Sequence, residues 1–403
     1  LREAKLGPNH PDTLKSQGNL ALAYEEARRR NRALPLLEET LKRMQVTLGP
    51  DHPDTLQAMG NLADGYISAG KHDQALPLCE ETLKLRKARL GPDHPATLNA
   101  MGLVARGYLN TDKLDQALRL FQETLELMTA KLGPDHPDTL RARVNVAVTY
   151  REAGKLDQAI PVFEETLKLM KAKRGPDHPE TRATTDALAN LLARQGKWIQ
   201  AADCFASLIQ SNPTNHWNHR NLAPLLVASE RLDVYRQHCR QAVERFGKTS
   251  DPFIAERIAK NCLILPDCGV GLDAVAHMAD TAAATTNRGA IPWFQLVKGL
   301  VEYRQGRFAS AVEWSNKTLT NTGQPVRDVE AYMVLAMAHY QFKQTDDARA
   351  ALAKGVEIER TKLPKLERGD IGGLWLDWII AHALMREAQA LIEGRPETES
   401  PTR

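Results

Sequence analysis

The amino-acid sequence predicts an all-α protein, an αα-solenoid in which one pair of helices is repeated and stacked. The first observation is a nonapeptide of the type Leu-Gly-Pro-Asp-His-Pro-Asp-Thr-Leu, which recurs five times at intervals of 42 residues. A fixed period of roughly 20–50 residues is typical of units that bury their cores against their neighbours. The second is composition, because Ala, Leu, Glu, Lys and Arg dominate the 403 residues and favour helices. The copies lie at residues 6–14, 48–56, 90–98, 132–140 and 174–182.

The first helix of each unit is expected to begin at the His-Pro-Asp-Thr of the nonapeptide. Proline fits the first helical turn because its missing N–H would have no partner there. The acidic residue that follows favours the positive end of the helix dipole. Three columns of residues at i, i+1 and i+4 then share one helix face. They are Leu20, Leu62, Val104, Val146 and Leu188; Ala21, Ala63, Ala105, Ala147 and Ala189; and Tyr24, Tyr66, Tyr108, Tyr150 and Leu192.

A turn of the type Gly-Lys-x-Asp precedes the second helix. Gly70 and Gly154 are expected to end the first helix, and Asp73 and Asp157 to cap the second. The second helix opens with an alanine, a small residue that lets helix axes approach to about 8–10 Å. The alanines and a later apolar column are Ala33, Ala75, Ala117, Ala159 and Ala201, and Leu41, Leu83, Leu125, Leu167 and Ile209.

The spaced pattern of Leu-Ala-x-x-Tyr and Gly-Lys-x-x-x-Ala resembles the tetratricopeptide repeat. The 42-residue period with its LGPDHP linker resembles the variety found in kinesin light chain. The resemblance covers residues 1–213 and implies a right-handed superhelix with a concave groove that binds other proteins. Residues 1–5 match Leu85–Arg89, the end of a second helix in a later unit. We therefore expect a fragment cut inside a repeat, with the apolar face of its first complete unit open.

The C-terminal half has a weaker pattern. Residues 293–319 and 332–358 each resemble one tetratricopeptide unit, and 374–393 predicts a last amphipathic helix. As a whole, residues 214–393 are expected to form degenerate helix pairs, and residues 394–403 a disordered tail. The local sequence of this half also resembles the C-terminal region of certain large bacterial serine/threonine protein kinases. The Gly-rich loop, H-R-D and D-F-G motifs of a kinase are absent from the sequence, so no catalytic residue is expected in this chain.

Composition narrows the possible partners. The formal net charge is only +3, so no overall basic field favours nucleic acid or an anionic membrane. No apolar run reaches the ~18 residues that a membrane span needs. Five cysteines without a CxxC pair predict reduced thiols and a cytoplasmic location. A protein or peptide partner is therefore expected, without cofactor or metal.

Several patterns that resemble chemical sites are better explained structurally. The repeated histidines belong to separate units, too far apart to share a zinc ion with ligands at ~2 Å. A second histidine cluster lacks ordered ligand spacing and is expected to lie in solvent or turns. Gly269-Val270-Gly271 lacks the strand and Lys-Ser/Thr of a phosphate loop. Adjacent acidic pairs at one point of the second helix are expected on a solvated outer face. These sets are His10, His52, His94, His136 and His178; His216, His219, His238 and Cys239; and Glu38-Glu39, Glu80-Glu81 and Glu164-Glu165.

One polar column is expected to bind a ligand. The position before Leu-Ala holds Asn19, Asn61 and Asn145, but Leu103 and Ala187 in the third and fifth units. In tetratricopeptide domains the matching asparagine faces the groove and binds the backbone of an extended peptide, so the resemblance implies this role for the three asparagines. A carboxamide both donates and accepts, as a peptide unit does. Alternatively, the asparagines tie one repeat to the next. Basic residues nearby, which would favour an acidic ligand, are Lys15, Arg106, Arg141 and Arg151.

Three functions stay open at this point. The leading hypothesis is a protein–protein interaction scaffold that holds a peptide or partner protein in its groove. The alternatives are the regulatory or docking region of a bacterial serine/threonine kinase, and the sensor arm of a signalling ATPase. All three share the same module and differ in what precedes Leu1.

Overall fold

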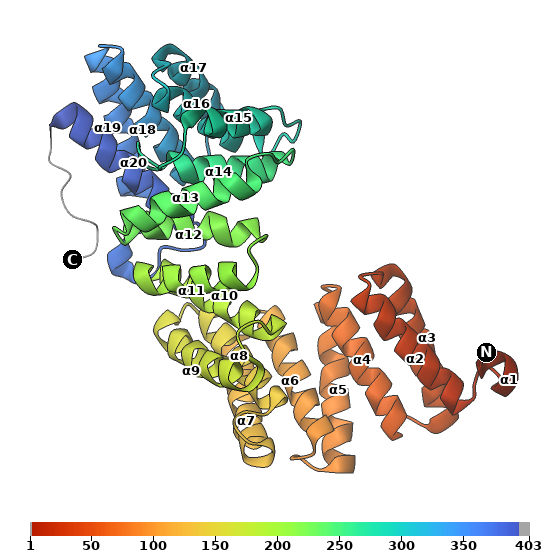
Figure 1. Cartoon of the computed structure of the whole chain (residues 1–403). Helices are drawn as coiled ribbons and strands as arrows, with labels where there is room; N and C mark the ends of the chain where they lie inside the picture. The colour runs from red at the N-terminus through yellow and green to blue at the C-terminus, as the bar shows by residue number, and fades with distance from the viewer. Residues whose placement is uncertain (1, 395–403) are drawn as a thin grey trace. The chain divides into compact units, whose positions relative to one another are not determined.

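The computed structural model describes residues 2–394, and within this range the chain is built from helices without strands. It divides into two compact units (Figure 1). Unit 1 ends at Gly175, and unit 2 begins at Pro176. The all-α solenoid prediction is confirmed. The predicted tail, residues 394–403, lies outside the described residues except for Gly394.

Unit 1 contains four successive helix pairs and a short preceding helix. Each pair has a 16-residue first helix and a 19-residue second helix, as the repeat predicts. The helices are α1 (Arg2–Leu6), α2 (Pro11–Glu26), α3 (Arg30–Leu48), α4 (Pro53–Ser68), α5 (His72–Leu90), α6 (Pro95–Asn110), α7 (Leu114–Leu132), α8 (Pro137–Glu152) and α9 (Leu156–Arg174).

The repeated histidines cap the first helices. His52 Nδ1 accepts the backbone N–H of Asp54 at 3.2 Å, and His136 accepts that of Asp138 at the same distance. The same arrangement occurs at the other three copies of the nonapeptide. A ring nitrogen thus supplies the acceptor that a serine or aspartate usually provides at this position.

The predicted aspartate caps of the second helices are wrong. Lys71 is the N-cap residue of α5 and makes no side-chain cap bond, while Asp73 already lies in the first turn. Lys155 and Asp157 repeat this arrangement in α9. The preceding Gly70 has φ of +73°, as expected for a helix-ending glycine, and the next helix starts only two residues later. The aspartates can therefore act on the helix dipole but cannot cap.

The core of unit 1 follows the predicted columns. The alanine column is fully buried, with Ala21, Ala63 and Ala105 at 0% exposure. Leu62 is 5% exposed, whereas the equivalent Leu20 on α2 is 48% exposed. Leu20 is thus exposed on α2, whereas Leu14 and Ala21 of the same helix are fully buried. The open apolar face expected of a fragment stays a prediction.

A tyrosine contact links successive repeats. The Tyr66 hydroxyl donates to Glu38 Oε1 at 2.8 Å, and the Tyr108 hydroxyl donates to Glu80 Oε1 at 2.8 Å. Both acids are exposed, as predicted for the acidic pairs, but each also accepts a bond from the next repeat. Burial together with its glutamate partner raises the pKa of Tyr66 to about 12.

Unit 2 continues with helix pairs and ends in a long helix. The units expected at 293–319 and 332–358 correspond to α16–α17 and α18–α19, and the segment before them also forms paired helices. The fifth repeat, α10–α11, belongs to this unit, because the two units divide after Gly175. The domain boundary expected after residue 213 stays a prediction. The helices are α10 (Pro179–Arg194), α11 (Trp198–Ser211), α12 (His216–Ala228), α13 (Leu232–Phe246), α14 (Pro252–Leu263), α15 (Leu272–Ala283), α16 (Ile291–Arg304), α17 (Phe308–Leu319), α18 (Pro325–Gln341), α19 (Thr345–Lys362), the 3₁₀ turn η1 (Leu366–Arg368) and α20 (Trp375–Glu393).

The last helix of unit 2 packs back onto earlier first helices. Helix α20 packs against α12, α18 and α19 (Figure 1). Its Trp375 indole donates to Asn190 Oδ1 of α10 at 3.2 Å, and Asp370 pairs with Arg194 of α10 at 2.5 Å. Asn190 is the equivalent, 84 residues later, of the predicted groove residue Arg106. In the fifth repeat, this first-helix position is therefore in contact with the chain's own C-terminal segment.

The expectation that the second histidine cluster lies in solvent or turns is wrong for two of its members, because His219 and His238 are 2% and 5% exposed within unit 2. The rings of His219 and His238 stack with centroids 5.2 Å apart. A ring nitrogen of each contacts a main-chain carbonyl, at Pro213 and His219 respectively. Burial lowers the pKa of His238 to about 4. These contacts give the two buried histidines a packing role within the unit.

Candidate functional site

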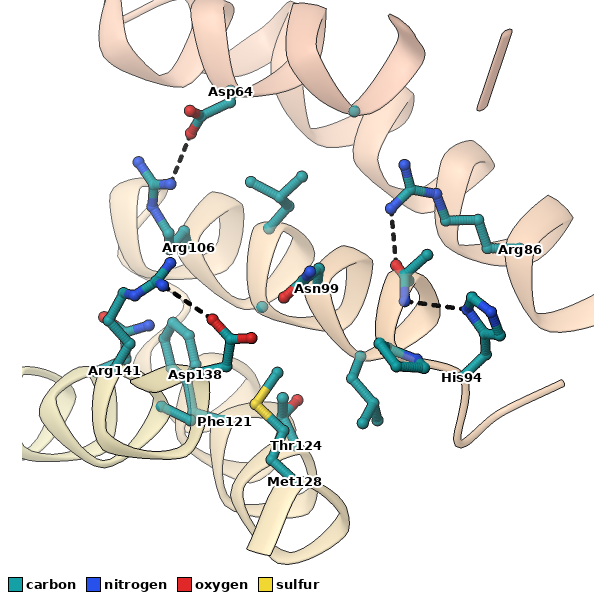
Figure 2. Close-up of a pocket in the computed structure, with 18 of the residues that line it drawn as sticks. Asp64, Arg86, His94, Asn99, Arg106, Phe121, Thr124, Met128, Asp138 and Arg141 are labelled. Carbon is teal, nitrogen blue, oxygen red and sulfur yellow. Dashed lines mark hydrogen bonds and ion pairs between the residues drawn. The ribbon is translucent and has the colours of Figure 1, made fainter. Parts of the chain in front are cut away.

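A cavity of about 660 Å³ opens among the helices of unit 1 (Figure 2). First helices α4, α6 and α8 contribute most of its wall, with α5 and α7 behind them. It contains four of the predicted groove residues, Asn61, Arg106, Arg141 and Asn145. A second cavity of about 210 Å³ is lined by Lys15, Asn19 and Asn61, so Asn61 borders both.

Arg151 is the one predicted residue that lines neither cavity. It is the second-last residue of α8 and pairs with the adjacent Glu152 at 2.5 Å. Its helical position turns it away from Asn145, because residues six apart on a helix do not share a face.

The carboxamides come from three successive repeats. Asn61 and Asn145 are half-buried at the cavity wall, and Asn61 Oδ1 accepts a hydrogen bond from Gln57 Nε2 at 2.9 Å. The third repeat has Leu103 in the predicted column, but Asn99 lies one turn earlier and is exposed to the same cavity. Figure 2 shows Asn99 near the middle of this cavity. The sequence pattern missed Asn99, although helical periodicity puts residues i and i+4 on one face.

The predicted basic residues are already paired with acids. Figure 2 shows the Arg106–Asp64 and Arg141–Asp138 pairs at one end of the cavity. Asp64 and Asp138 thus reduce the positive charge that the sequence suggested for this surface. The four pairs are Lys15–Asp54 at 3.0 Å, Arg106–Asp64 at 2.6 Å, Arg141–Asp138 at 2.8 Å and Arg151–Glu152 at 2.5 Å.

A fifth cation, Arg86 of α5, lines the cavity and was missed by the sequence analysis. It is 4% exposed, and its guanidinium donates to Ala96 O at 2.7 Å and to Leu56 O at 2.9 Å. Its Nη2 also lies 3.5 Å from Gln57 Oε1. Among the described residues, no carboxylate forms an ion pair with Arg86, and burial lowers the pKa of its guanidinium. Figure 2 shows Arg86 and His94 at the end of the cavity opposite the two ion pairs.

Arg86 differs from the residues at the same position in the other repeats, and this difference is visible in the sequence. The equivalent positions in the other three units hold Met44, Met128 and Met170, which are buried at 3%, 5% and 1% exposure. The helix opposite makes room for the arginine. A Cβ at Gly60 of α4 would lie 3.1 Å from Arg86 Nη2, so the glycine permits close approach.

The cavity has a mixed polar and apolar wall. Its wall combines carboxamides, paired charges and apolar side chains such as Phe121 and Met128. Both acids of the wall are held by arginines, and the described residues contain no group of three or more metal-ligating side chains. No helix among these residues combines the length and apolarity that crossing a bilayer requires.

Comparisons with solved structures return repeat proteins. Nearly identical TPR-like repeats from a Podosopora anserina protein assigned as a kinesin light chain share 24% identity, covering 50% of this chain and 95% of that one with a TM-score of 0.44. BtubC (BKLC) from P. vanneervenii shares 15% identity over 76% of this chain and 90% of its own, with a TM-score of 0.37. A tetratricopeptide repeat protein from Parabacteroides merdae shares 14% identity over 70% and 98%, with a TM-score of 0.47. No curated protein matches significantly.

Family comparisons identify the repeat directly. A tetratricopeptide repeat model matches residues 29–87, 57–130, 102–172 and 144–211, and a second tetratricopeptide model matches residues 329–362. The expected likeness of residues 214–393 to bacterial kinases is not shown by these matches and stays a prediction. Together the matched segments cover more than half of the sequence, and the chain belongs to the tetratricopeptide repeat family.

Proposed function

We propose that unit 1 binds an extended peptide segment of a partner protein along the groove formed by its two cavities. Tetratricopeptide proteins generally mediate protein–protein interactions, and repeat solenoids use their extended concave surfaces for this purpose. Their fold is typically a scaffold without catalytic activity. A cytoplasmic location for this interaction stays a prediction from the reduced cysteines.

One observation carries the proposal. Three successive first helices present carboxamides to one cavity, through Asn61, Asn99 and Asn145. A peptide in extended conformation leaves its own N–H and C=O groups without partners, and a carboxamide can satisfy one of each. Asn19 extends the series into the second cavity.

The hydrogen bond made by Asn61 supports ligand binding over the alternative of a strut between repeats. A strut would bond to a neighbouring repeat, whereas Asn61 accepts from Gln57 on its own helix α4. Tyrosine–glutamate contacts such as Tyr66–Glu38 already link adjacent repeats.

The ion pairs bear on the chemistry of the ligand. Lys15, Arg106, Arg141 and Arg151 were expected to favour an acidic peptide, but each has a carboxylate partner. An acidic ligand would have to displace those partners before it could bind the basic residues. Because an exposed ion pair contributes only about 0–1 kcal/mol, exchanging one carboxylate for another there would add little to the binding free energy. We therefore assign main-chain recognition by the asparagines as the primary interaction.

Selection of peptides provides the test. A phage-displayed library of unconstrained 12-residue peptides is selected on the immobilised chain, and the affinity of enriched peptides is measured by fluorescence anisotropy. Asn61→Ala should weaken binding by about 0.5–1.5 kcal/mol, the usual net contribution of a neutral hydrogen bond. Thermal unfolding should barely change.

The matched control is Asn110→Ala. Asn110 is an exposed asparagine at the end of α6 that lines neither cavity, so its loss should leave affinity unaltered. Failure to enrich any peptide, or equal affinity of Asn61→Ala and the parent chain, would show that the groove does not have this function. Lost stability with unchanged affinity would instead identify the asparagine as a strut.

A further inference from the structure

Arg86 is the one buried cation of the cavity that has no acidic partner. The wall carries three arginines and two aspartates, and Arg106 and Arg141 are paired with Asp64 and Asp138. Within residues 2–394, the charge of Arg86 is met by two main-chain carbonyls and the Gln57 amide alone. The cavity therefore has an excess of one positive charge, located at Arg86.

Folding does not explain the presence of this arginine. The other three repeats place a buried methionine at the equivalent position and form the same helix pairs. Burying an ion without a counter-ion costs several kcal/mol, and neutral acceptors offset this cost only in part. The Leu56 and Ala96 carbonyls lie within helices, where they have backbone partners available four residues later.

We propose that Arg86 is the receptor for a single carboxylate side chain, an aspartate or glutamate, of the extended peptide that unit 1 binds. The inference rests on the proposed function and names the one acidic position of its ligand. A guanidinium has five N–H donors and can hold a carboxylate through two parallel bonds. A ligand carboxylate would supply the missing counter-charge without displacing Asp64 or Asp138.

The carboxylate is assigned to a side chain within the peptide because the groove continues on both sides of Arg86. Arg86 bonds to α4 and α6, and Asn19 lies before this point while Asn145 lies beyond it. A peptide that contacts both asparagines crosses α4 and α6, the two helices to which Arg86 bonds, with its main chain uninterrupted. A C-terminal carboxylate would end the chain there and leave one side of the groove without a ligand.

The experiment couples a change in the protein to a change in the ligand. The selected 12-residue peptides are synthesised with amidated C-termini, and the acidic residue that they have in common is identified. The affinity of each is compared with that of a second peptide, its amide twin, in which this aspartate or glutamate is replaced by asparagine or glutamine. The parent chain should bind the acidic peptide about 10-fold or more tightly than its amide twin. Arg86→Met should reduce this ratio to about one and keep or raise thermal stability, because methionine is the residue of the other repeats.

Two further variants separate recognition from general electrostatics. Arg89→Met removes one positive charge from the same helix, but Arg89 pairs with Asp51 outside the cavity and its loss should leave the ratio intact. Arg86→Lys should recover part of the ratio, since it restores the charge without the two-pronged geometry.

The outcomes are distinct. Enriched peptides that share no acid, or a ratio that persists in Arg86→Met, would overturn the role of Arg86 while leaving peptide binding by the groove intact. A peptide whose free C-terminal carboxylate replaces the acid at equal, Arg86-dependent affinity would overturn the side-chain assignment. Selection that enriches nothing would instead refute the proposed function itself.

Discussion

A buried charged cluster joins three helices of unit 2 and gives a quantitative test of its electrostatics. Lys260 of α14 lies with its Nζ 2.7 Å from Asp377 Oδ1 of α20 and 2.9 Å from Glu330 Oε2 of α18. The three side chains are 5%, 6% and 0% exposed. The ammonium also lies 4.9 Å from the centre of the Trp293 ring. This cluster links α20 to α14 and α18.

Three substitutions should rank in a definite order. Lys260→Met removes the ammonium closest to the buried Asp377 carboxylate and leaves it only the more distant Arg220, at 3.8 Å. Removing one partner of a buried pair typically costs about 3–5 kcal/mol. Glu330→Gln should cost less than about 1 kcal/mol at pH 7, because burial raises the pKa of Glu330 to about 8 and keeps this carboxyl largely protonated. Asp377→Asn should fall between them, since Glu330 can then ionise and balance Lys260.

The raised pKa also fixes the sign of the pH dependence. The unperturbed pKa of a glutamate is 4.5, so between this pH and about pH 8 the folded state holds a proton that the unfolded chain has released. Glu330 therefore contributes stability that is fully present below pH 4.5 and is lost as pH rises towards 8. Glu330→Gln should flatten this part of the profile.

Tryptophan fluorescence during urea unfolding measures unit 2 selectively. All six tryptophans of the chain lie in unit 2, at Trp198, Trp217, Trp293, Trp314, Trp375 and Trp378. The reasoning would be refuted if Glu330→Gln proved as destabilising as Lys260→Met at pH 7. It would also be refuted if the variant showed the same loss of stability between pH 5 and 8 as the parent chain.

Three further predictions concern contacts that repeat along the chain. Tyr108→Phe should destabilise unit 1 by about 0.5–1.5 kcal/mol, measured by far-UV circular dichroism in urea, because the bond to Glu80 is lost; no change would mean that solvent replaces it. His136→Ala should cost about 0.5–1 kcal/mol through loss of the cap at Asp138, and His136→Asn should restore most of it; equal loss in both variants would exclude capping as the cause. Excess chelator should leave thermal unfolding unchanged, since the described residues bring no three metal-ligating side chains together; a cooperative loss of helix would contradict this.

The sequence alone determined the helices and their period, because the signals for both are local. The nonapeptide places a helix-starting proline at a fixed interval, and α4, α6 and α8 begin at it. The alanine columns predicted where helices approach, and these residues are fully buried. Each position of the repeat occurs in several copies within the sequence. A residue that differs in one copy therefore did not hide the residue type that the position usually holds.

Much of the candidate site was also accessible from the sequence. Asn61 and Asn145 were identified because the resemblance to tetratricopeptide domains implies that their column faces the groove, and both line the cavity. Asn99 was missed because only that column was read, although the position one turn earlier shares its face. Arg86 was not predicted because the groove residues of the resembled family lie on first helices, although the methionines at its equivalent positions on second helices distinguish it within the sequence.

Only the tertiary structure decided the electrostatic state of the groove and the placement of the last helix. Whether Arg106 is free or paired depends on Asp64, which is 42 residues away and approaches it only when two repeats stack. Likewise, the sequence predicts the helix that became α20, but its contact with Lys260 spans 117 residues. Local propensity and periodicity act over one or two helical turns. Pairing of charges across repeats depends on distances of a few ångströms between distant segments, and these are set by packing of the whole unit.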